Sequence, residues 1–138
     1  MVSSATEAAP VPAPVLDHVQ IAAPRGCEEA ARHFYGELLG LAEIEKPEPL
    51  RPTGGVWFAL GSGQLHIGVA HPFTPARKAH PALRVSGGQL RALADRLEAA
   101  GAPVEWNDLI PDVQRFFTDD PWGNRLELLA HEPAPRRS

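Results

Sequence analysis

Three histidines and one glutamate in this chain have the side-chain types and the spacing of a metal site. The sequence separation between His18 and His66 nearly equals the separation between His80 and Glu127. Imidazole nitrogens and a carboxylate oxygen are suitable ligands for a divalent first-row metal ion such as zinc, iron, nickel, cobalt or manganese. Four such ligands would leave a six-coordinate ion with open positions for water or substrate oxygens. These four residues are therefore the predicted metal ligands.

The chain repeats one order of predicted elements, and these elements would position the four side chains. In the first half, a strand, a helix and three strands are predicted at residues 16–22, 27–41, 41–48, 55–61 and 64–70. In the second half, the same order is predicted at residues 80–85, 87–101, 103–109, 113–120 and 125–130. Both helices carry an apolar stripe at three- and four-residue spacing, and Gly40 and Gly101 follow as stop signals. Each half is therefore predicted to be a βαβββ module.

Alternation along the strands predicts which side chains lie away from the helix-covered core. Val19 and Ile21 share one face of the first strand, and His18 lies on the other. The same alternation gives an inward position to the other three candidate ligands, His66, His80 and Glu127. One helix covers only one face of a four-stranded module, so two modules are expected to pair. We predict an α+β fold in which two paired βαβββ modules form an eight-stranded curved sheet around a cavity, with the helices outside.

Composition sets the boundaries of these modules. Residues 1–14 are rich in proline and alanine and are predicted to be a disordered tail, as are residues 132–138. The first module is expected at residues 15–70 and the second at residues 80–131. A connector at residues 71–79 would join them, either within one chain or by passing one module to a partner.

Charge and cysteine content exclude several classes of function. A formal net charge of -4 argues against a nucleic-acid partner and against a membrane partner, which leaves small molecules and proteins. Cys27 is the only cysteine, so the chain has neither an intrachain disulfide nor a thiolate metal cluster. The start of the chain lacks the features of a signal peptide. We expect a cytoplasmic protein.

Further inward-facing residues are candidates for substrate binding. Arg84 and Arg125 share a face with the predicted ligands, where each could pair with an anionic substrate or with Glu127. Three aromatic residues could line the cavity or pack in the core: Trp57, Phe116 and Trp122. Alternation leaves open whether Trp57 or its neighbour faces inward. The remaining histidines are assigned to surface or connector positions: His33, His71 and His131.

Three stretches of the chain resemble the vicinal oxygen chelate superfamily: "LDHV", "HPALRV" and "DDPWGNRLELL". This superfamily includes glyoxalase I, methylmalonyl-CoA epimerase, fosfomycin-resistance enzymes, extradiol dioxygenases and bleomycin-resistance proteins. The resemblance spans about residues 15–130 and implies that His18, His80 and Glu127 are metal ligands. It places His66 at the variable fourth ligand position, where glyoxalase I has a glutamate and the epimerase a glutamine. Histidine at this position argues against strict glyoxalase I activity.

The resemblance implies a metal-dependent enzyme that acts on a small oxygen-bearing substrate chelated by a divalent metal. The reaction would be glyoxalase-, epimerase- or lyase-like, with Glu127 and His66 as the candidates that move a proton, or ring cleavage by an Fe(II) dioxygenase. The alternative is a non-catalytic protein of the bleomycin-resistance type that binds an antibiotic or toxin. Family analogues form the cavity within one chain or across a dimer, and we expect a homodimer.

Overall fold

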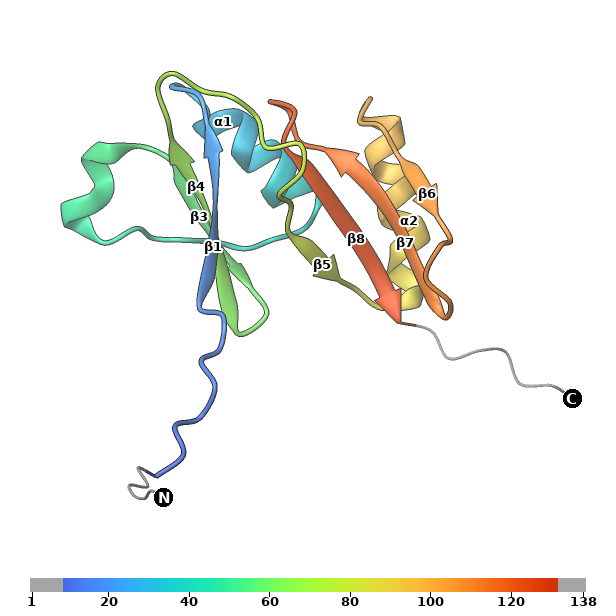
Figure 1. Cartoon of the computed structure of the whole chain (residues 1–138). Coiled ribbons are helices and arrows are strands. Elements are labelled where there is room, and N and C mark those ends of the chain that lie inside the picture. Colours follow the sequence, from blue (N-terminus) through green and yellow to red (C-terminus); the bar gives the residue numbers. More distant parts are fainter. Residues whose placement is uncertain (1–8, 132–138) are drawn as a thin grey trace, which may run out of the picture.

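The computed structural model describes residues 9–131, which form two modules with one mixed sheet each (Figure 1). The N-terminal module contains β1 (His18–Ala23), β2 (Glu43–Ile44), β3 (Val56–Leu60) and β4 (Gly63–Val69). The C-terminal module contains β5 (Ala82–Arg84), β6 (Glu105–Asn107), β7 (Val113–Asp119) and β8 (Arg125–His131). The helices are α1 (Glu28–Ala31), which continues into the π-helical η1 (Arg32–Leu38), the 3₁₀ helix η2 (Glu48–Thr53), and α2 (Gly87–Ala99).

The two sheets have the same topology. Their strand orders are β1-β4-β3-β2 and β5-β8-β7-β6, and in each sheet the first pair is parallel while the others are antiparallel. This repetition confirms the predicted pair of βαβββ modules and the α+β class. The eight strands form two separate four-stranded sheets that do not close into a barrel (Figure 1). β1 and β5 are therefore edge strands, each bonded on one side only.

Side-chain alternation separates a helix-covered face from an open face in both sheets. Leu65 and Ile67 of β4 are buried against the helices, as are Leu126 and Leu128 of β8. In Figure 1, α1 and α2 lie behind the sheets, so neither of these helices covers the front of its sheet. The predicted ligands lie on these open faces, because their positions alternate with the buried aliphatic side chains.

Two segments differ from the expected elements. β1 begins at His18, where pairing with Gln64 of β4 starts, and the preceding Val15 and Leu16 are exposed because no strand lies beside them. The strand expected at 41–48 shortens to β2, since prolines at 47 and 49 have no N–H to donate to a sheet. Residues 1–8 and 132–138, where disordered tails were predicted, lie outside the described part of the chain.

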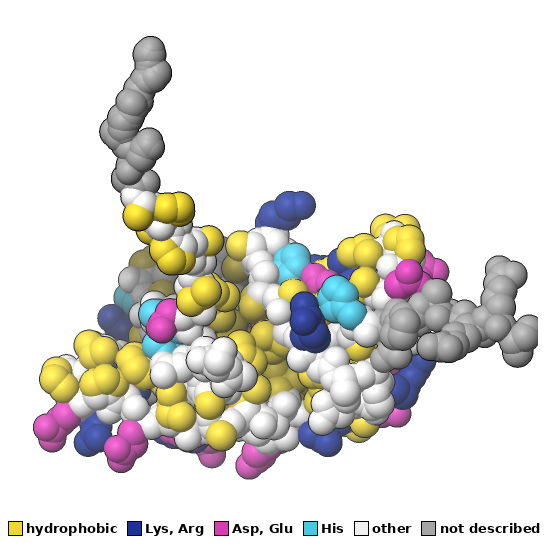
Figure 2. Space-filling model, turned by 90° about the horizontal axis from the view of Figure 1, so that it is seen from below, with side chains coloured by type: hydrophobic (Ala, Val, Ile, Leu, Met, Phe, Trp, Pro, Cys, Tyr) yellow, Lys and Arg dark blue, Asp and Glu magenta, His cyan; other side chains and the backbone are white. Residues whose placement is uncertain are grey.

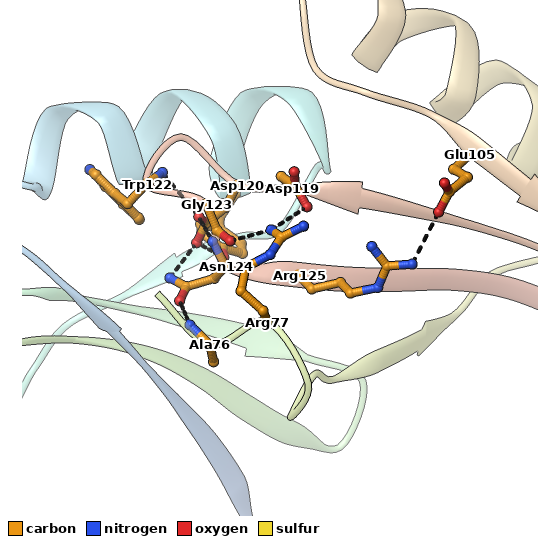
Figure 3. Close-up of polar contacts among 10 residues, drawn as sticks. Ala76, Arg77, Glu105, Asp119, Asp120, Trp122, Gly123, Asn124 and Arg125 are labelled. Atoms are coloured by element: carbon orange, nitrogen blue, oxygen red, sulfur yellow. Dashed lines mark hydrogen bonds and ion pairs between the residues drawn. The ribbon is translucent and has the colours of Figure 1, made fainter. Parts of the chain in front are cut away.

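The turn between β7 and β8 ties the two modules together (Figure 3). Asn124 in this turn donates its side-chain N–H to the carbonyl of Ala22 in β1 at 2.9 Å and accepts the N–H of Ala76 at 2.9 Å. Asp120 accepts the N–H of Asn124 at 2.8 Å and the hydroxyl of Tyr35 at 2.7 Å. Burial, followed by the charge of Asp120, raises the pKa of Tyr35 well above its usual range. The turn therefore contacts β1, the connector and η1 at once.

Candidate functional site

His66 lies in an aromatic stack on the open face of the N-terminal sheet. Its ring is 3.7 Å from the Trp57 ring, nearly parallel to it, and 4.3 Å from the His18 ring on the other side. Sheet register produces this stack, because Trp57 of β3 is directly opposite His66 of β4. His66 is buried, with 4% of its surface exposed. His18 and His66, the N-terminal pair, are thus brought together as predicted.

Polar neighbours fix the orientation of these two rings. His66 Nε2 lies 2.7 Å from the amide oxygen of Gln64, which accepts its proton and leaves Nδ1 as the free nitrogen. His18 Nδ1 lies 2.8 Å from a carboxylate oxygen of Asp17. Burial and the nearby positive charge of His18 lower the pKa of His66, which favours the neutral ring. A neutral imidazole is the form that binds a metal ion.

His80 and Glu127, the C-terminal pair, contact each other across β5 and β8. His80 Nε2 is 2.9 Å from Glu127 Oε1, and His80 Nδ1 is 3.0 Å from the carbonyl oxygen of Lys78. Both ring nitrogens therefore face acceptors, and a neutral imidazole has only one N–H to donate. A neutral ring can therefore donate to only one of these two acceptors.

The spacing of this pair also fits a metal ion. Two ligand atoms at about 2.1 Å from one ion and at a right angle to each other lie about 3 Å apart. The observed 2.9 Å between His80 Nε2 and Glu127 Oε1 matches that spacing. The C-terminal pair thus places one nitrogen and one oxygen at a separation that two ligands of one ion could have.

Arg115 is a site residue that the sequence analysis missed. Its Nη1 donates to Glu127 Oε2 at 3.2 Å and its Nη2 donates to the Asn107 side chain at 3.0 Å. Glu127 is buried at 7% exposure and thus has one oxygen held by Arg115 and the other facing His80. Alternation along β7 could have identified Arg115, because it lies two residues before Phe117, which pairs with Glu127.

The residues predicted to bind substrate occupy different environments. Arg125 lies on the open face, over the Phe117 ring at 4.2 Å, and pairs with Glu105 at 3.1 Å (Figure 3). Arg84 is exposed on β5. Trp57 lies on the open face against His66, whereas its neighbour Phe58 is buried in the core. Alternation had left open which of the two faces inward.

The two other aromatic candidates lie away from the open faces. Phe116 is fully buried in the core beside Trp106, so its neighbour Phe117 is the phenylalanine that contacts the site. Trp122 lies in the β7–β8 turn and packs against the core. The remaining three histidines are exposed, as predicted: His33, His71 and His131.

The N-terminal and C-terminal pairs belong to different sheets. Within residues 9–131, no three His, Cys, Asp or Glu side chains lie close enough to hold a metal ion. A groove of about 640 Å³ lies between β1 and β5, lined mainly by apolar side chains such as Val19, Ile21 and Leu83. Figure 2 shows histidines on either side of a hollowed, largely hydrophobic region. One chain therefore presents two ligand pairs and not a single four-ligand site.

No helix within residues 9–131 is long and apolar enough to cross a membrane.

The chain is similar to known proteins over most of its length. Residues 15–128 match the sequence model of the Glyoxalase/Bleomycin resistance protein/Dioxygenase superfamily. A glyoxalase family protein from Bacillus anthracis is 45% identical, with a TM-score of 0.83 over 89% of this chain and 99% of that one. No curated protein matches the chain.

Two more distant structures share the fold. Lactoylglutathione lyase from Agrobacterium tumefaciens is 21% identical, with a TM-score of 0.67 over 87% of this chain and 96% of that one. The fosfomycin resistance protein FosX from Listeria monocytogenes is 14% identical, with a TM-score of 0.67 over 83% of this chain and 88% of that one.

Proposed function

The chain belongs to the Glyoxalase/Bleomycin resistance protein/Dioxygenase superfamily, and on this basis we propose that it is a metal-dependent enzyme acting on a small oxygen-bearing substrate. The proposed ligands of the divalent ion are His18, His66, His80 and Glu127. The observation that carries this proposal is the C-terminal pair, where His80 Nε2 and Glu127 Oε1 lie 2.9 Å apart and His80 has acceptors at both nitrogens. The reaction class is that of a lyase, an isomerase or a dioxygenase.

We propose further that the site is completed by a second copy of the chain. The N-terminal pair and the C-terminal pair lie on the open faces of separate sheets. Among residues 9–131, no third candidate ligand lies close to either pair. In a homodimer, the N-terminal sheet of one copy would face the C-terminal sheet of the other. Each of the two sites would then contain His18 and His66 from one copy with His80 and Glu127 from its partner.

When bound, the metal ion would supply Lewis acidity to the substrate oxygens. Arg115 holds one oxygen of Glu127, which leaves the other oxygen of this carboxylate to act as a ligand. His66 offers Nδ1, since its Nε2 is bonded to Gln64. Nδ1 is therefore the atom by which His66 would bind the metal or accept a proton. For both histidines to bind one ion, the His18 ring, which is 44% exposed, would turn out of its stack.

A second candidate function is sequestration of an apolar antibiotic or toxin. It is favoured by the apolar groove of about 640 Å³ between β1 and β5, which is large enough for a drug-sized molecule. This function needs no metal. For either function we propose the cytoplasm as the location, because Cys27 is a free, buried thiol.

Metal content measured by elemental analysis of untagged protein tests the enzyme proposal. We expect bound divalent metal in the wild-type protein and its loss in His18→Ala and in Glu127→Ala. His33→Ala is the matched control, because His33 is exposed and bonds Glu37 away from both pairs. Wild-type protein that remains metal-free after incubation with zinc, iron, nickel, cobalt and manganese would contradict the proposal and leave sequestration as the function.

Mixing the two variants that are expected to lose metal, His18→Ala and Glu127→Ala, tests whether two copies of the chain share each site. A heterodimer of His18→Ala and Glu127→Ala contains one site with all four ligands and one site lacking two. Unfolding and refolding an equal mixture should therefore restore about one quarter of the wild-type metal capacity, whereas neither variant alone binds metal. If each site lay within one chain, the mixture would recover nothing.

A further inference from the structure

A small hollow lies beside the N-terminal pair, on the open face of the same sheet. Its volume is about 220 Å³, several times the roughly 30 Å³ that a water molecule occupies in the liquid. Trp57 forms one wall, Gln20 and Gly68 lie at the sheet, and η2 with the segment before it closes the other side. Gly68 makes room for the Gln20 side chain, because a Cβ at residue 68 would lie 2.7 Å from Gln20 Cδ.

The charged residue that lines this hollow is positive. Its lining residues include one cation, Lys46, and no carboxylate. The Lys46 ammonium donates to Thr53 Oγ1 at 3.0 Å and to the carbonyl oxygen of Gly54, which are both neutral acceptors. Among residues 9–131, the ion pairs do not include Lys46. A lysine ammonium has three donors, so one N–H is left for a ligand.

The neighbouring arginines do not share this property. Arg32 pairs with Glu43 at 2.9 Å and Arg51 approaches Glu45 at 3.7 Å. The two arginines are thus paired directly with carboxylates. Lys46 makes no such direct ion pair, although Glu28, which accepts the Gly55 N–H at 2.7 Å, lies near enough for the charge of Lys46 to lower the pKa of that carboxyl. A cation held by neutral acceptors beside an open space is suited to an incoming anion.

The hollow shares two neighbouring residues with His66 of the N-terminal pair. Gln20 and Trp57 are the register neighbours of His66 on either side, in β1 and β3. Trp57 stacks on His66 with one face and belongs to the wall of the hollow. A molecule with its reacting oxygens at the histidines could therefore extend a substituent past Trp57 to Lys46.

We propose that this hollow, hereafter the Lys46 hollow, binds an anionic oxygen group of the substrate, such as a carboxylate, phosphate or phosphonate. The substrate would then be a small acid, with its chelating oxygens at the metal and its anionic group at Lys46. Gln20 offers an amide N–H to the same group, and Trp57 shields it from water. This inference deepens the proposed function and rests on it for the identity of the bound molecule as a substrate.

Nuclear magnetic resonance titration of the metal-free protein tests this binding directly. Acetate and, separately, inorganic phosphate are added at constant ionic strength, while the Trp57 indole N–H and the Gly54 and Gly68 amides are followed. Trp57→Phe assigns the indole signal. We expect saturable shifts with at least one of the two anions and none with acetamide, which has the shape of acetate without its charge.

Four variants locate the binding. Lys46→Met should weaken anion binding at least tenfold and Lys46→Arg should retain it, whereas Arg25→Met removes an exposed charge elsewhere and should change nothing. Gly68→Ala keeps the charge of Lys46 but displaces Gln20 into the hollow, so it should also weaken binding. Equal binding by wild type and Lys46→Met, or no saturable shift in the wild type, would overturn the inference.

The metal measurements separate the two proposals. If the wild-type protein binds metal but neither anion, the proposed enzyme function stands. The proposal that the Lys46 hollow binds an anion is then refuted. Anion binding that depends on Lys46 in a protein that never takes up metal would support the hollow and refute the metal-dependent function.

Discussion

At the scale of single residues, Glu127 illustrates how a buried carboxylate is kept in place. One of its oxygens accepts a hydrogen bond from Arg115 and the other faces His80, so both oxygens have partners. Removing a partner of a buried charge leaves that charge without compensation, which is costlier than losing an exposed ion pair. Arg115 therefore contributes to stability as well as to the orientation of Glu127.

Arg115→Met should lower the free energy of unfolding by about 2 kcal/mol, since one charged hydrogen bond to the buried Glu127 is lost. Urea denaturation of metal-free protein measures this change. Arg84→Met is the matched control, because Arg84 is exposed on β5 of the same sheet, and its effect should stay within about 0.5 kcal/mol. Equal effects of the two substitutions would show that Arg115 does not stabilise Glu127.

His66 should make the stability of the metal-free protein depend on pH. Burial and the charge of His18 lower its pKa below the ordinary value of 6.5, so the unfolded chain binds this proton more readily than the folded one. The contribution of His66 to stability is therefore complete above the unfolded-state pKa. It is lost as the pH falls through the lower folded-state pKa.

Urea denaturation of the wild type and of His66→Gln, measured from about pH 8 to about pH 5, tests this dependence. The wild type should lose more stability on acidification than the variant, which has no titratable group at residue 66. Parallel pH profiles would contradict the prediction, because the other histidines are common to both proteins.

At the scale of elements, the β7–β8 turn holds the modules in their relative positions. Asn124 bonds the backbone of β1 and of the connector, and Asp120 bonds Tyr35 of η1. The turn thus links the two modules, and β1 and β5 lie on either side of one groove.

Asn124→Ala should lower the free energy of unfolding by about 2–4 kcal/mol, because it removes three side-chain hydrogen bonds in a buried turn. Tyr35→Phe removes one and should cost about 1–2 kcal/mol. Thermal and urea denaturation measure both changes. Gln114→Ala removes an exposed amide on β7 and serves as the control. A loss in Asn124→Ala no larger than in this control would show that the turn does not link the modules.

At the scale of the whole molecule, sequence periodicity predicted the modules but not their placement. Alternation identified the open-face residues of β1, β4 and β8, because strand periodicity is a local property of the chain. The arrangement of one sheet beside the other depends on long-range contacts such as those of Asn124, which no periodicity contains. The sequence predicted that four ligands lie together at one site, whereas the structure places these residues in two separate pairs.

The residues that sequence reasoning missed share a physical reason. Arg115 and Lys46 are recognised by their partners, Glu127 in one case and neutral oxygens in the other. Charged residues are common on protein surfaces, so residue type alone does not distinguish a buried cation, or one held by neutral oxygens, from an ordinary surface cation. The sequence also does not show that Phe117 and not Phe116 contacts the site, because adjacent aromatic residues give no alternation.

The proposed shared site makes metal retention depend on protein concentration. Dissociation of the dimer separates the N-terminal pair from the C-terminal pair, so dilution should release the metal together with the partner. Sedimentation at decreasing protein concentration, combined with metal analysis of each species, measures this relation. Monomers that keep a full complement of metal would contradict a site shared between copies.

The edge position of β1 and β5 has a consequence for an isolated subunit. Each of these strands has no neighbouring strand on one side, although the carbonyl of Ala22 in β1 is bonded by Asn124, and such an edge is a template for adding strands from other chains. A subunit produced faster than it meets its partner would therefore be the aggregation-prone species, and co-refolding at high concentration would protect against insolubility.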